Sequence, residues 1–523
     1  MPRFLPIRET VMLSSVYSAG LEGVDGYIVT VECNMSPRLA AFEIVGLPDA
    51  AVKEAKERIR AAICNSGYEF PDAEITINLA PADKKKQGSA YDLALLAGVL
   101  ACSGDLPDKL EGMCFIGELS LSGEVRPVRG VLSMCDAARA AGLTEIFVPA
   151  RNAAEASVIQ GVTVYPVPDV VSLVKHLNGE RPLVPAAFDK SSFFGGVVRH
   201  QFDFADVKGQ EFAKRALQIA AAGGHNVLMI GPPGTGKSML AKRIPSILPD
   251  FTLEEAIETT KIHSIAGLLP ENVSLIAQRP FRSPHHTMSS VSLAGGGTIP
   301  MPGEVSLAHN GVLFLDELPE FSKTVAEVLR QPLEDRQITI TRASGRLTFP
   351  CNFMLVCAMN PCRCGYFGHP SKNCSCKPSE IRSYLAKVSG PLVDRIDIQI
   401  EVSPLSFEEL SKPMQTRTST ELRDEVNRAR AIAIERCRRD GLKAYCNAEL
   451  SPAELRRYCA LDDAATAIMR AAFENMGLSA RGYDRILRVA RTIADLDGSE
   501  SIKAHHIAEA VQLRALDRKY WQR

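Results

Sequence analysis

One segment constrains the fold of this chain more than any other: the eight residues GPPGTGKS at positions 231 to 238. They fit the pattern G-x-x-x-x-G-K-[ST], follow the apolar run NVLMI and precede the helical pattern MLAKRIPSIL. Glycine at 231, 234 and 236 allows the loop to curl so that backbone N–H groups point inward at phosphate oxygens, and the following helix adds its positive N-terminal end. The segment therefore predicts a phosphate-binding loop between a buried strand and a helix. The alternative is a glycine-rich turn with an incidental lysine.

Two side chains of this segment are expected to contact a nucleotide directly. Lys237 would reach the β and γ phosphates of ATP, and the hydroxyl of Ser238 would bind Mg²⁺. The backbone of the whole segment would surround the phosphates. The predicted ATP-binding residues are therefore Gly231, Pro232, Pro233, Gly234, Thr235, Gly236, Lys237 and Ser238.

An acidic pair follows a second apolar strand further along the chain, in GVLFLDELPE. Two carboxylates at the end of a buried strand are costly unless they face a cation or a functional site. We expect Asp316 to complete the Mg²⁺ shell and Glu317 to orient the water that attacks the γ phosphate. The pair alone would fit an ordinary strand end, but its position after a phosphate loop favours the catalytic interpretation.

A third apolar strand, FMLVCAMNP, ends at Asn360. Its amide is expected to hydrogen-bond the attacking water and to sense the γ phosphate. The alternative is that Asn360 caps the turn before Pro361, a common role of asparagine. The order of the three motifs along the chain favours the first interpretation, so Lys237, Glu317 and Asn360 are predicted to be catalytic.

The length of 523 residues exceeds what one hydrophobic core supports and suggests several domains. Residues 1–185 alternate short apolar runs (YIVTVEC, AEITINLA, EIFVPA and VTVYPV) with helical patterns, which predicts an α/β domain. The stretch 179–196 contains proline and glycine without helical or strand periodicity, so a domain boundary is expected there, with 186–202 as the linker. Residues 203–403 predict a parallel sheet covered by helices, with a cysteine-rich insertion at 362–376. Residues 404–523 contain successive amphipathic helices and no convincing strand, so this domain is expected to be helical.

Charge and hydropathy limit the partners. The chain carries 60 Lys and Arg against 61 Asp and Glu, so any contact with a polyanion must come from a local patch. The sequence lacks a secretory signal, and no segment approaches the ~20 apolar residues of a spanning helix. We therefore expect a cytoplasmic protein without a membrane partner, whose 14 cysteines are reduced or bind metal.

Four cysteines crowd into the insertion with the spacing C-x-C-x9-C-x-C. Four thiolates with small or turn-forming neighbours can close a tetrahedral zinc site, which would brace a loop that has no core of its own. His369 is an alternative ligand, and a metal-free reduced loop is the alternative to the whole site. The predicted zinc ligands are Cys362, Cys364, Cys374 and Cys376.

Together, the phosphate loop, the strands LFLDE and AMNP, and the segments GPLVDRIDI and GLSARGYDRILRVARTIADLDG resemble the AAA+ ATPases of the magnesium-chelatase-like group, and within it the ComM/YifB family. The resemblance covers essentially the whole chain and is most specific between residues 206 and 402. It implies a ring, expected to be a hexamer, with ATP bound between neighbouring subunits.

The resemblance also implies roles for two arginines. Arg395 would be the arginine finger that enters the adjacent subunit's site and stabilises charge as the phosphate departs, and Arg481 would be the sensor on the helical lid. Alternatively, Arg395 forms a surface ion pair with Asp394 or Asp397. Arg481 has its own alternatives, because it would also serve as a helix cap and Arg485 lies one turn later.

Two segments within 203–403 are expected to contact the substrate, which the resemblance suggests is single-stranded or branched DNA. Residues 335–350 predict a hairpin with Arg336, Arg342 and Arg346 projecting from it, and the last two are the predicted DNA contacts. The second segment, 262–303, is rich in glycine and proline. Its basic side chains are Arg279, Arg282, His285 and His286. The alternative is a solvated hairpin and a mobile loop.

The N-terminal domain resembles the proteolytic domain of Lon proteases, through NLAPADKKKQGSAYDLALLAGVLA and GELSLSGEVRPVRGVLSMCDAARAAG. The family's active segments carry a serine nucleophile and a lysine partner. Here Ala90 occupies the serine position and Leu132 the lysine position, while Ser89 lies one residue away without a lysine base. We therefore expect a retained, non-proteolytic fold used for assembly or DNA contact.

The resemblance to the ComM/YifB family implies an ATP-driven ring motor on DNA, specifically a branch-migration helicase that acts in recombination of incoming DNA during natural transformation. The first alternative is an ATP-dependent motor of the magnesium-chelatase type that remodels a protein partner, although such subunits do not generally carry a Lon-like domain. An ATP-dependent protease is a third hypothesis, disfavoured by the missing lysine.

Overall fold

A computed structural model of this chain describes residues 12–107, 110–190, 193, 200–270, 273–297, 300–342, 345–405, 407, 416–442, 444, 446–516 and 520–521. The chain divides into two compact units. The first comprises Met1–Gly196 and Ala256–Ile276, and the second comprises Val197–Glu255 and Ala277–Arg523. Most of the residues between 191 and 199, in the predicted linker, lie outside the described ranges.

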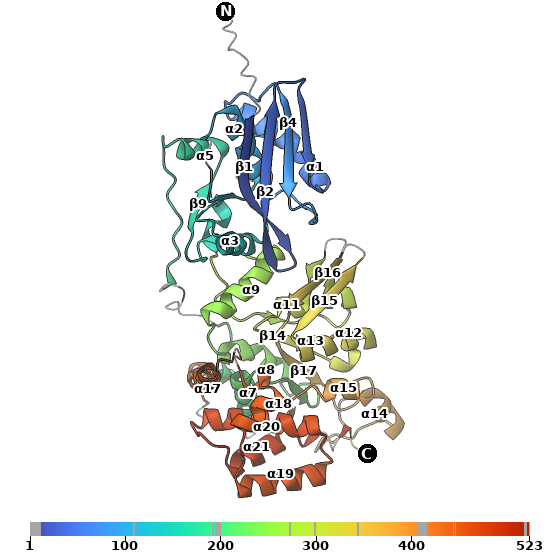
Figure 1. The fold of residues 1–523 in the computed structure, drawn as a ribbon. Helices are drawn as coiled ribbons and strands as arrows, with labels where there is room; N and C mark the ends of the chain where they lie inside the picture. Colours follow the sequence, from blue (N-terminus) through green and yellow to red (C-terminus); the bar gives the residue numbers. More distant parts are fainter. Residues whose placement is uncertain are drawn as a thin grey trace, which may run out of the picture. The chain divides into compact units, whose positions relative to one another are not determined.

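The first unit is built on a seven-stranded sheet with the order β3-β4-β2-β1-β5-β8-β9 (Figure 1). β1 and β2 form a long antiparallel hairpin, β2 also pairs antiparallel with β4, and the remaining neighbours are parallel. The strands are β1 (Met12–Glu22), β2 (Asp25–Ser36), β3 (Ala41–Val45), β4 (Glu74–Ala80), β5 (Met113–Phe115), β8 (Glu145–Pro149) and β9 (Thr163–Val167), with a small separate pair β6 (Glu118–Leu119) and β7 (Val125–Arg126). The helices are α1 (Ala50–Asn65), α2 (Asp92–Ser103), α3 (Val131–Ala140), α4 (Ala153–Ala156) and α5 (Val170–Leu177).

Local sequence explains the two main helices of this sheet. The side chain of Asp49 accepts a hydrogen bond from the backbone of Val52 and so caps α1, whose apolar residues recur every three or four positions on its buried face. α2 is buried along almost its whole length, because apolar and small residues cover all of its sides. It therefore forms the centre of this unit's core.

The sequence analysis missed β1, because polar residues occupy two of its buried positions. The hydroxyl of Ser14 donates to the carbonyl oxygen of Gly98 at 2.8 Å, and that of Ser18 donates to the carbonyl oxygen of Phe115 at 2.8 Å. Burial of a hydroxyl is tolerated when it is hydrogen-bonded, and a hydropathy pattern does not record such partners.

The first unit also takes residues 256–276, which the sequence analysis assigned to the domain 203–403. The first part of this segment belongs to the helix α9 (Leu253–Ile265). The hydroxyl of Ser264 donates to Glu155 at 2.6 Å and accepts from the backbone of Gly130 at 3.0 Å, and Lys261 pairs with Asp136 at 2.6 Å. These bonds tie a helix from the middle of the chain to α3 and α4 of the N-terminal unit.

The second unit contains a five-stranded sheet with the order β11-β14-β17-β10-β18, and all four strand pairs are parallel. The strands are β10 (Val227–Ile230), β11 (Phe281–Arg282), β14 (Val312–Leu315), β17 (Met354–Met359) and β18 (Ile398–Glu401). Two hairpins lie outside this sheet: β12 (Gly295–Gly296) with β13 (Met301–Pro302), and β15 (Gln337–Arg342) with β16 (Gly345–Pro350). The predicted parallel sheet is therefore confirmed.

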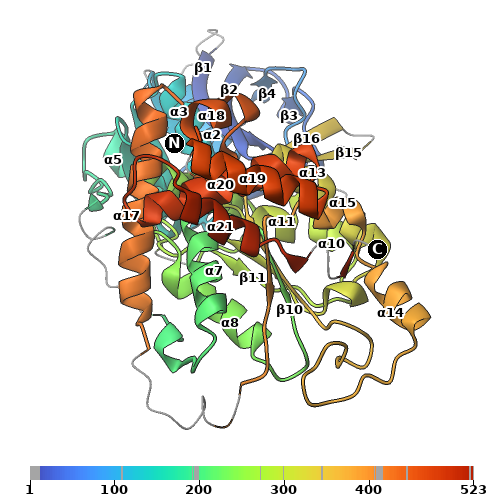
Figure 2. The same ribbon diagram turned by 90° about the horizontal axis from the view of Figure 1, so that it is seen from below.

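Helices accompany this sheet and continue to the end of the chain (Figure 2). Apart from α9, the helices between residues 203 and 403 are α7 (Glu211–Gly223), α8 (Lys237–Arg243), α10 (Ser290–Ala294), α11 (Glu304–Leu307), α12 (Lys323–Val328), α13 (Arg330–Asp335), α14 (Pro378–Leu385) and α15 (Gly390–Val393). The C-terminal helices are α17 (Ser419–Arg439), α18 (Pro452–Tyr458), α19 (Asp463–Met476), α20 (Ala480–Leu496) and α21 (Ala504–Gln512). The predicted helical character of the C-terminal region is confirmed, although residues 408–415 lie outside the described ranges.

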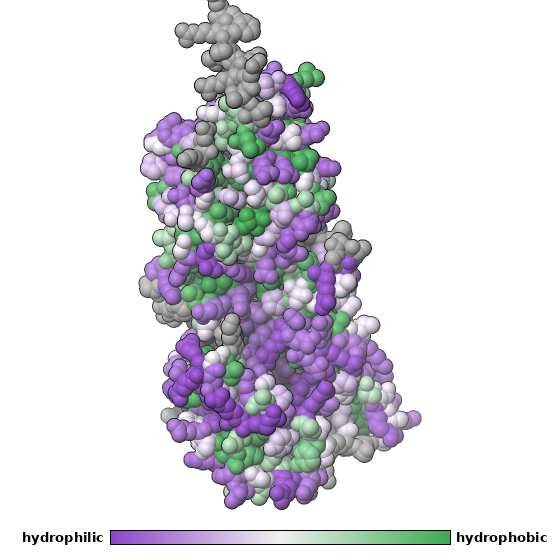
Figure 3. All heavy atoms as spheres, viewed as in Figure 1, coloured by the Kyte–Doolittle hydropathy of each residue, from purple (hydrophilic) through white to green (hydrophobic). Residues whose placement is uncertain are grey.

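The C-terminal helices share one hydrophobic core with the parallel sheet. α17 and α20 both pack on α7, so the described parts of 203–403 and 404–523 form a single compact unit. Figure 3 shows that the visible surface of this unit around α13 and α18 is mainly hydrophilic. In the described part of the chain, no helix has the length and apolar character that a bilayer crossing requires.

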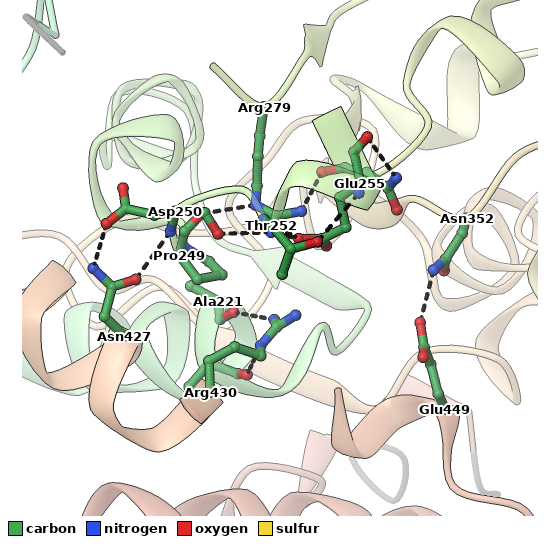
Figure 4. Close-up of polar contacts among 12 residues, drawn as sticks. Ala221, Pro249, Asp250, Thr252, Glu255, Arg279, Asn352, Asn427, Arg430 and Glu449 are labelled. Carbon is green, nitrogen blue, oxygen red and sulfur yellow. Dashed lines mark hydrogen bonds and ion pairs between the residues drawn. The ribbon is translucent and has the colours of Figure 1, made fainter. Parts of the chain in front are cut away.

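A buried ion pair joins the two ends of the second unit on either side of the segment 256–276. The guanidinium of Arg279 lies 2.7 Å from the carboxylate of Glu255, and their side chains are 8% and 4% exposed. Arg279 also donates to the backbone carbonyl oxygens of Pro249, Asp250 and Asn310 (Figure 4). Breaking such a pair would leave a charge buried and unpaired, so Arg279 is a structural residue.

Candidate functional site

The phosphate loop connects β10, which ends at Ile230, to α8, which begins at Lys237. Gly234 and Gly236 have φ values of 80° and 91°, in the left-handed region that favours glycine. Gly231 is required for a different reason, because a Cβ atom there would lie 2.3 Å from the carbonyl oxygen of Val402. The loop conformation thus depends on the three glycines of the motif.

Lys237 lies buried within the curl of this loop. Its ammonium group donates to the carbonyl oxygens of Gly231 and Pro232 at 2.7 and 2.8 Å, and to the side-chain oxygen of Asn360 at 3.2 Å. Burial lowers the pKa of Lys237 to about 8, although Asp316 and Glu317 act in the opposite direction. A bound phosphate would favour the charged ammonium group, so this position suits a polyanionic ligand.

The strand order β14-β17-β10 brings the predicted residues together at the carboxyl edge of the sheet. Asp316 follows β14 and accepts a hydrogen bond of 2.6 Å from the hydroxyl of Ser238, at the start of α8. Asn360 follows β17 and contacts Lys237, which supports its placement at the phosphate site. A hydroxyl and a carboxylate in direct contact provide oxygen ligands of the kind that Mg²⁺ prefers.

Glu317 lies beside this pair in a sparsely populated backbone conformation. Its φ of 53° is unusual for a residue other than glycine, and its backbone N–H donates to Asp316 at 3.0 Å. Conformations of this kind cluster at functional sites, where the surrounding structure enforces them. The side chain of Glu317 is 60% exposed, with Nδ1 of His286 at 4.0 Å. Its carboxylate can therefore contact a water molecule above the phosphate loop.

His286 is a residue that the sequence analysis placed in a different role. It was considered as part of a substrate-contact segment, whereas its ring lies 4.0 Å from the carboxylate of Glu317 and stacks on His285 with ring centroids 4.1 Å apart. The signal that would have located it is its position just after β11, next to β14 in the sheet.

Arg395 and Arg481 come together away from the phosphate loop, and neither contacts Lys237 or Ser238. Both approach the same oxygen of Glu334: Arg395 forms a close ion pair with it, and Arg481 lies 4.0 Å from it. The two alternatives for Arg395, pairing with Asp394 or with Asp397, are not what the structure shows.

Arg485, the alternative to Arg481, forms its ion pair with a different carboxylate. It pairs with Asp397 at 3.1 Å, and the two side chains are 14% and 9% exposed. Burial disfavours the charged form of Asp397, but Arg485 and neighbouring donors outweigh this and hold its pKa well below the usual range. Because Arg485 is fixed in this buried pair and Arg481 is 68% exposed, Arg481 is the better candidate for contact with a ligand.

The four cysteines of the insertion converge on one point. The sulfur of Cys362 lies 3.4 Å from that of Cys364 and 3.7 Å from that of Cys374, and Cys364 and Cys374 are 3.6 Å apart. All four sulfur atoms, including that of Cys376, lie within 4.8 Å of one another. The backbone of Phe367 donates to the Cys362 sulfur. This is a suitable donor set for one tetrahedral metal ion.

His369 is directed to its own loop. Its Nδ1 accepts hydrogen bonds from the backbone of Ser371 at 3.1 Å and of Lys372 at 3.0 Å. The insertion also packs on the phosphate loop, because a Cβ atom on Gly365 would lie 2.6 Å from the ring of Pro233. A shift of the insertion backbone at Gly365 would therefore displace Pro233 of the phosphate loop.

The predicted DNA-contact residues Arg342 and Arg346 are exposed, on adjacent strands of the hairpin β15–β16. The turn residues 343 and 344 lie outside the described ranges. Arg336 does not project from this hairpin as predicted. It contacts Glu449 at 3.3 Å and the carbonyl oxygen of Ala448 at 2.9 Å, and so links the hairpin base to the helical region.

The prediction that Arg279 contacts a substrate was also wrong, because Arg279 is enclosed by the pair with Glu255. Arg282 forms two bonds of 2.6 and 2.7 Å with the carboxylate of Glu304, and its contact with a substrate stays a prediction. Sequence shows that a segment carries arginine, but it does not show which carboxylate far along the chain neutralises it.

In the N-terminal unit, the two positions matched to the Lon catalytic pair are part of the core. Ala90 is 7% exposed and Leu132 is completely buried. The hydroxyl of Ser89 makes a close hydrogen bond with Glu118. Lys86 is buried and donates to the carbonyl oxygen of Pro81, and burial lowers its pKa.

Three family models match this chain. Residues 203–410 match "Magnesium chelatase, subunit ChlI", residues 31–152 match "Subunit ChlI of Mg-chelatase", and residues 416–514 match "Magnesium chelatase, subunit ChlI C-terminal". The matched segments cover the parallel sheet, much of the N-terminal unit and the C-terminal helices.

Similar proteins extend over the whole chain. The competence protein ComM of Haemophilus influenzae is 43% identical over 510 residues, which cover 97% of this chain and 98% of the relative. YifB of Escherichia coli K12 is 42% identical over 513 residues, with the same coverage of 97% and 98%. The magnesium-chelatase 67 kDa subunit of Chlorobaculum parvum is 25% identical over 240 residues, 44% of this chain and 32% of that protein.

Replacement of Glu317 and of Lys237 should separate nucleotide hydrolysis from nucleotide binding. Glu317→Gln should bind ATP like the parent and lose hydrolysis by about 100-fold or more, because the attacking water loses its orienting carboxylate. Lys237→Ala should weaken ATP binding itself by about 10- to 100-fold, because a charge-assisted hydrogen bond to the phosphates is lost. Fluorescent nucleotide titration and phosphate release would measure the two effects.

A suitable control is Glu320→Gln, which removes an exposed carboxylate of the same turn that pairs with Lys387 at 3.3 Å. It should hydrolyse ATP like the parent. Near-normal turnover in Glu317→Gln would remove Glu317 from the catalytic role.

Proposed function

The chain belongs to the ComM/YifB family of magnesium-chelatase-like proteins, and we propose that it is an ATP-hydrolysing ring motor that acts on DNA. Membership of this family implies an AAA+ ATPase that uses ATP and Mg²⁺. Because the Haemophilus relative is a competence protein, the proposed role is branch migration in recombination of incoming DNA during natural transformation. The observation that carries the ATPase part is the meeting of Lys237, Ser238, Asp316 and Asn360 at one sheet edge.

The proposed hydrolysis assigns one task to each of these side chains. Lys237 and the loop backbone would bind the β and γ phosphates, while Ser238 and Asp316 would hold Mg²⁺, which would neutralise phosphate charge. Glu317 would accept a hydrogen bond from the attacking water and orient it, and Asn360 would contact the γ phosphate. Phosphoryl transfer depends mainly on alignment and charge neutralisation, and this arrangement provides both.

The proposed ring, with six subunits, would complete each site with groups from a neighbour. Arg395 as the finger and Arg481 as the sensor lie together in this chain and contact neither Lys237 nor Ser238. This supports their action on a nucleotide held by an adjacent subunit. An arginine finger supplies large rate factors because it stabilises charge on the departing phosphate.

The proposed DNA contacts are Arg342 and Arg346 on the exposed hairpin β15–β16. Arginines that bind backbone phosphates do so without reading bases, and their repetition around a ring builds a strong site from a chain with a net charge of only -1. A second candidate is a motor that remodels a protein partner. It is supported by the similarity to the Chlorobaculum magnesium-chelatase subunit, which is restricted to 44% of the chain.

We also propose that the chain is not a protease. The identity of Ala90 and Leu132 supports this, because neither side chain has a nucleophilic or basic atom, and both are packed in the core. The Lon-like fold of the N-terminal unit, its use in assembly or DNA contact, and a cytoplasmic location stay predictions.

Finally, we propose that the four cysteines of the insertion bind one structural Zn²⁺. A tetrahedron with metal–sulfur distances of about 2.3 Å has edges of about 3.8 Å, which is close to the observed sulfur–sulfur distances of 3.4 to 3.7 Å. The ion would brace a loop that lacks its own apolar core and that packs against Pro233 of the phosphate loop.

Metal analysis tests the zinc proposal. Protein prepared without chelator should contain about one Zn²⁺ per chain, and Cys374→Ser should lower that content because one of four ligands is lost. The control Cys64→Ser, which changes an exposed cysteine of α1, should keep the parent's zinc content. A parent protein that carries no zinc would sink the proposal.

Salt-dependent DNA binding tests the hairpin. Arg342→Ala with Arg346→Ala should weaken binding to all DNA sequences alike and should reduce the slope of log K against log salt by about 2 per subunit, because two phosphate contacts no longer release counterions. Basal ATPase should survive, since neither side chain is assigned to the nucleotide.

The matched control is Arg438→Ala with Arg439→Ala, which removes the same charge from the exposed end of α17. It should keep the parent's salt slope. If the hairpin variant binds and moves branched DNA like the parent, the DNA assignment fails and the protein-remodelling alternative becomes the better one.

A further inference from the structure

We propose that Glu334 is a positioning residue that holds the finger Arg395 and the sensor Arg481 inside their own subunit, until the triphosphate of a neighbouring subunit displaces it. The proposal rests on the ring ATPase proposed above and adds a step to it. Each arginine would exchange a carboxylate partner in its own chain for a phosphate partner in the next one.

Glu334 lies where three elements of the second unit meet. It sits near the C-terminal end of α13, Arg395 lies between α15 and β18, and Arg481 occupies the first turn of α20. Both guanidinium groups approach one oxygen, Oε1 of Glu334. The hydrogen bond from Arg395 lowers the pKa of Glu334, and Arg481 acts in the same direction. A single anion thus holds together two cations that would otherwise repel each other.

In this structure the side chain of Arg395 is bonded within its own subunit. Its side chain is only 10% exposed, and one of its terminal nitrogens donates to the carbonyl oxygen of Pro391 at 2.6 Å. The buried Nε has no hydrogen-bond partner. An arginine finger must reach a phosphate outside its own subunit, so Arg395 has to leave this contact. The unsatisfied buried Nε costs free energy in the held state, which makes departure of Arg395 easier.

The nearby pair of Arg485 and Asp397 shows why Glu334 suits exchange. Both members of that pair are at least 86% buried, because their side chains are 14% and 9% exposed, so breaking it would strand a buried charge. The Glu334 side chain is 48% exposed and Arg481 is 68% exposed. Ion pairs of that exposure are weak, and water can take over the carboxylate once the arginines leave.

A triphosphate is the appropriate competitor. Arginine binds phosphate through charge-assisted hydrogen bonds that are stronger than an exposed contact with a carboxylate. Since Arg395 and Arg481 are already adjacent, both can be transferred to the same γ phosphate. ATP in one subunit would then release the arginines of the next, and release would depend on assembly as well as on the nucleotide.

The variant Glu334→Gln keeps the shape of the side chain and removes its charge. ATPase activity measured against protein concentration should reach half its maximum at about two- to fivefold lower protein, the range expected from loss of a half-exposed ion pair. The apparent KM for ATP should fall by a similar factor, while kcat at saturating protein and ATP should stay at the parent's value. A merely structural role would lower the Tm and kcat and would leave the concentration dependence unchanged.

Glu327→Gln is the matched control. Glu327 lies on the neighbouring helix α12, is 49% exposed, nearly the same as Glu334, and pairs at 2.6 Å with Arg330, the first residue of α13. This variant should keep the parent's concentration dependence. Adding Glu334→Gln to the double variant Arg395→Ala with Arg481→Ala should change nothing further, because Glu334 is proposed to act through these two arginines.

A Glu334→Gln protein with the parent's concentration dependence, or with a reduced kcat, would overturn the proposal. Arg395→Ala alone distinguishes this failure from that of the proposed function. If Arg395→Ala hydrolyses ATP like the parent, the finger assignment itself is wrong. If Arg395→Ala loses activity while Glu334→Gln matches the parent, the ring ATPase stands and only the holding role of Glu334 fails.

Discussion

Parallel pairing of β14, β17 and β10 is the constraint on which the second unit depends. Parallel strands end at the same edge of a sheet, so three segments far apart in the chain deliver Asp316, Asn360 and Lys237 to one place. The strands are completely apolar and buried, and the polar side chains appear only where the strands end. The fold therefore creates the nucleotide site without burying an unpaired carboxylate.

Two further features are proposed to act on a nucleotide site of this kind. The cysteine insertion packs against Pro233, so a metal that orders the insertion would also restrict the phosphate loop. The arginines proposed to act on a neighbour are held by Glu334 instead of standing free in solvent. The cysteine insertion would stabilise the nucleotide site within a subunit, and the arginines held by Glu334 would connect that site to the next subunit. Under these proposals, the nucleotide site of one chain has its own phosphate loop and acidic pair but needs the arginines of a neighbouring subunit for hydrolysis.

The sequence predicted the parallel sheet and the helical C-terminal region, because glycine spacing and apolar periodicity report local conformation and burial. It predicted the family through the resemblance of several motifs to those of known proteins. It placed Ser238 beside Asp316 correctly, since a motif and a strand end determine both positions. It missed β1, because the partners that satisfy Ser14 and Ser18 lie far along the chain. It also misassigned Arg279 and Arg336 and overlooked Glu334. Ion-pair partners are chosen by tertiary packing, and no periodicity records that choice.

The central claim is that a site is completed only by a neighbouring subunit, and mixing two inactive variants tests it most directly. In Glu317→Gln the finger is intact and the water-orienting carboxylate is absent, whereas in Arg395→Ala the reverse holds. We expect each variant to hydrolyse ATP poorly alone, and their mixture to recover activity wherever an intact finger meets an intact site. A mixture no more active than the separate variants would contradict the account. So would an ATPase activity of Arg395→Ala that is reduced relative to the parent by the same factor when both proteins are diluted to monomers.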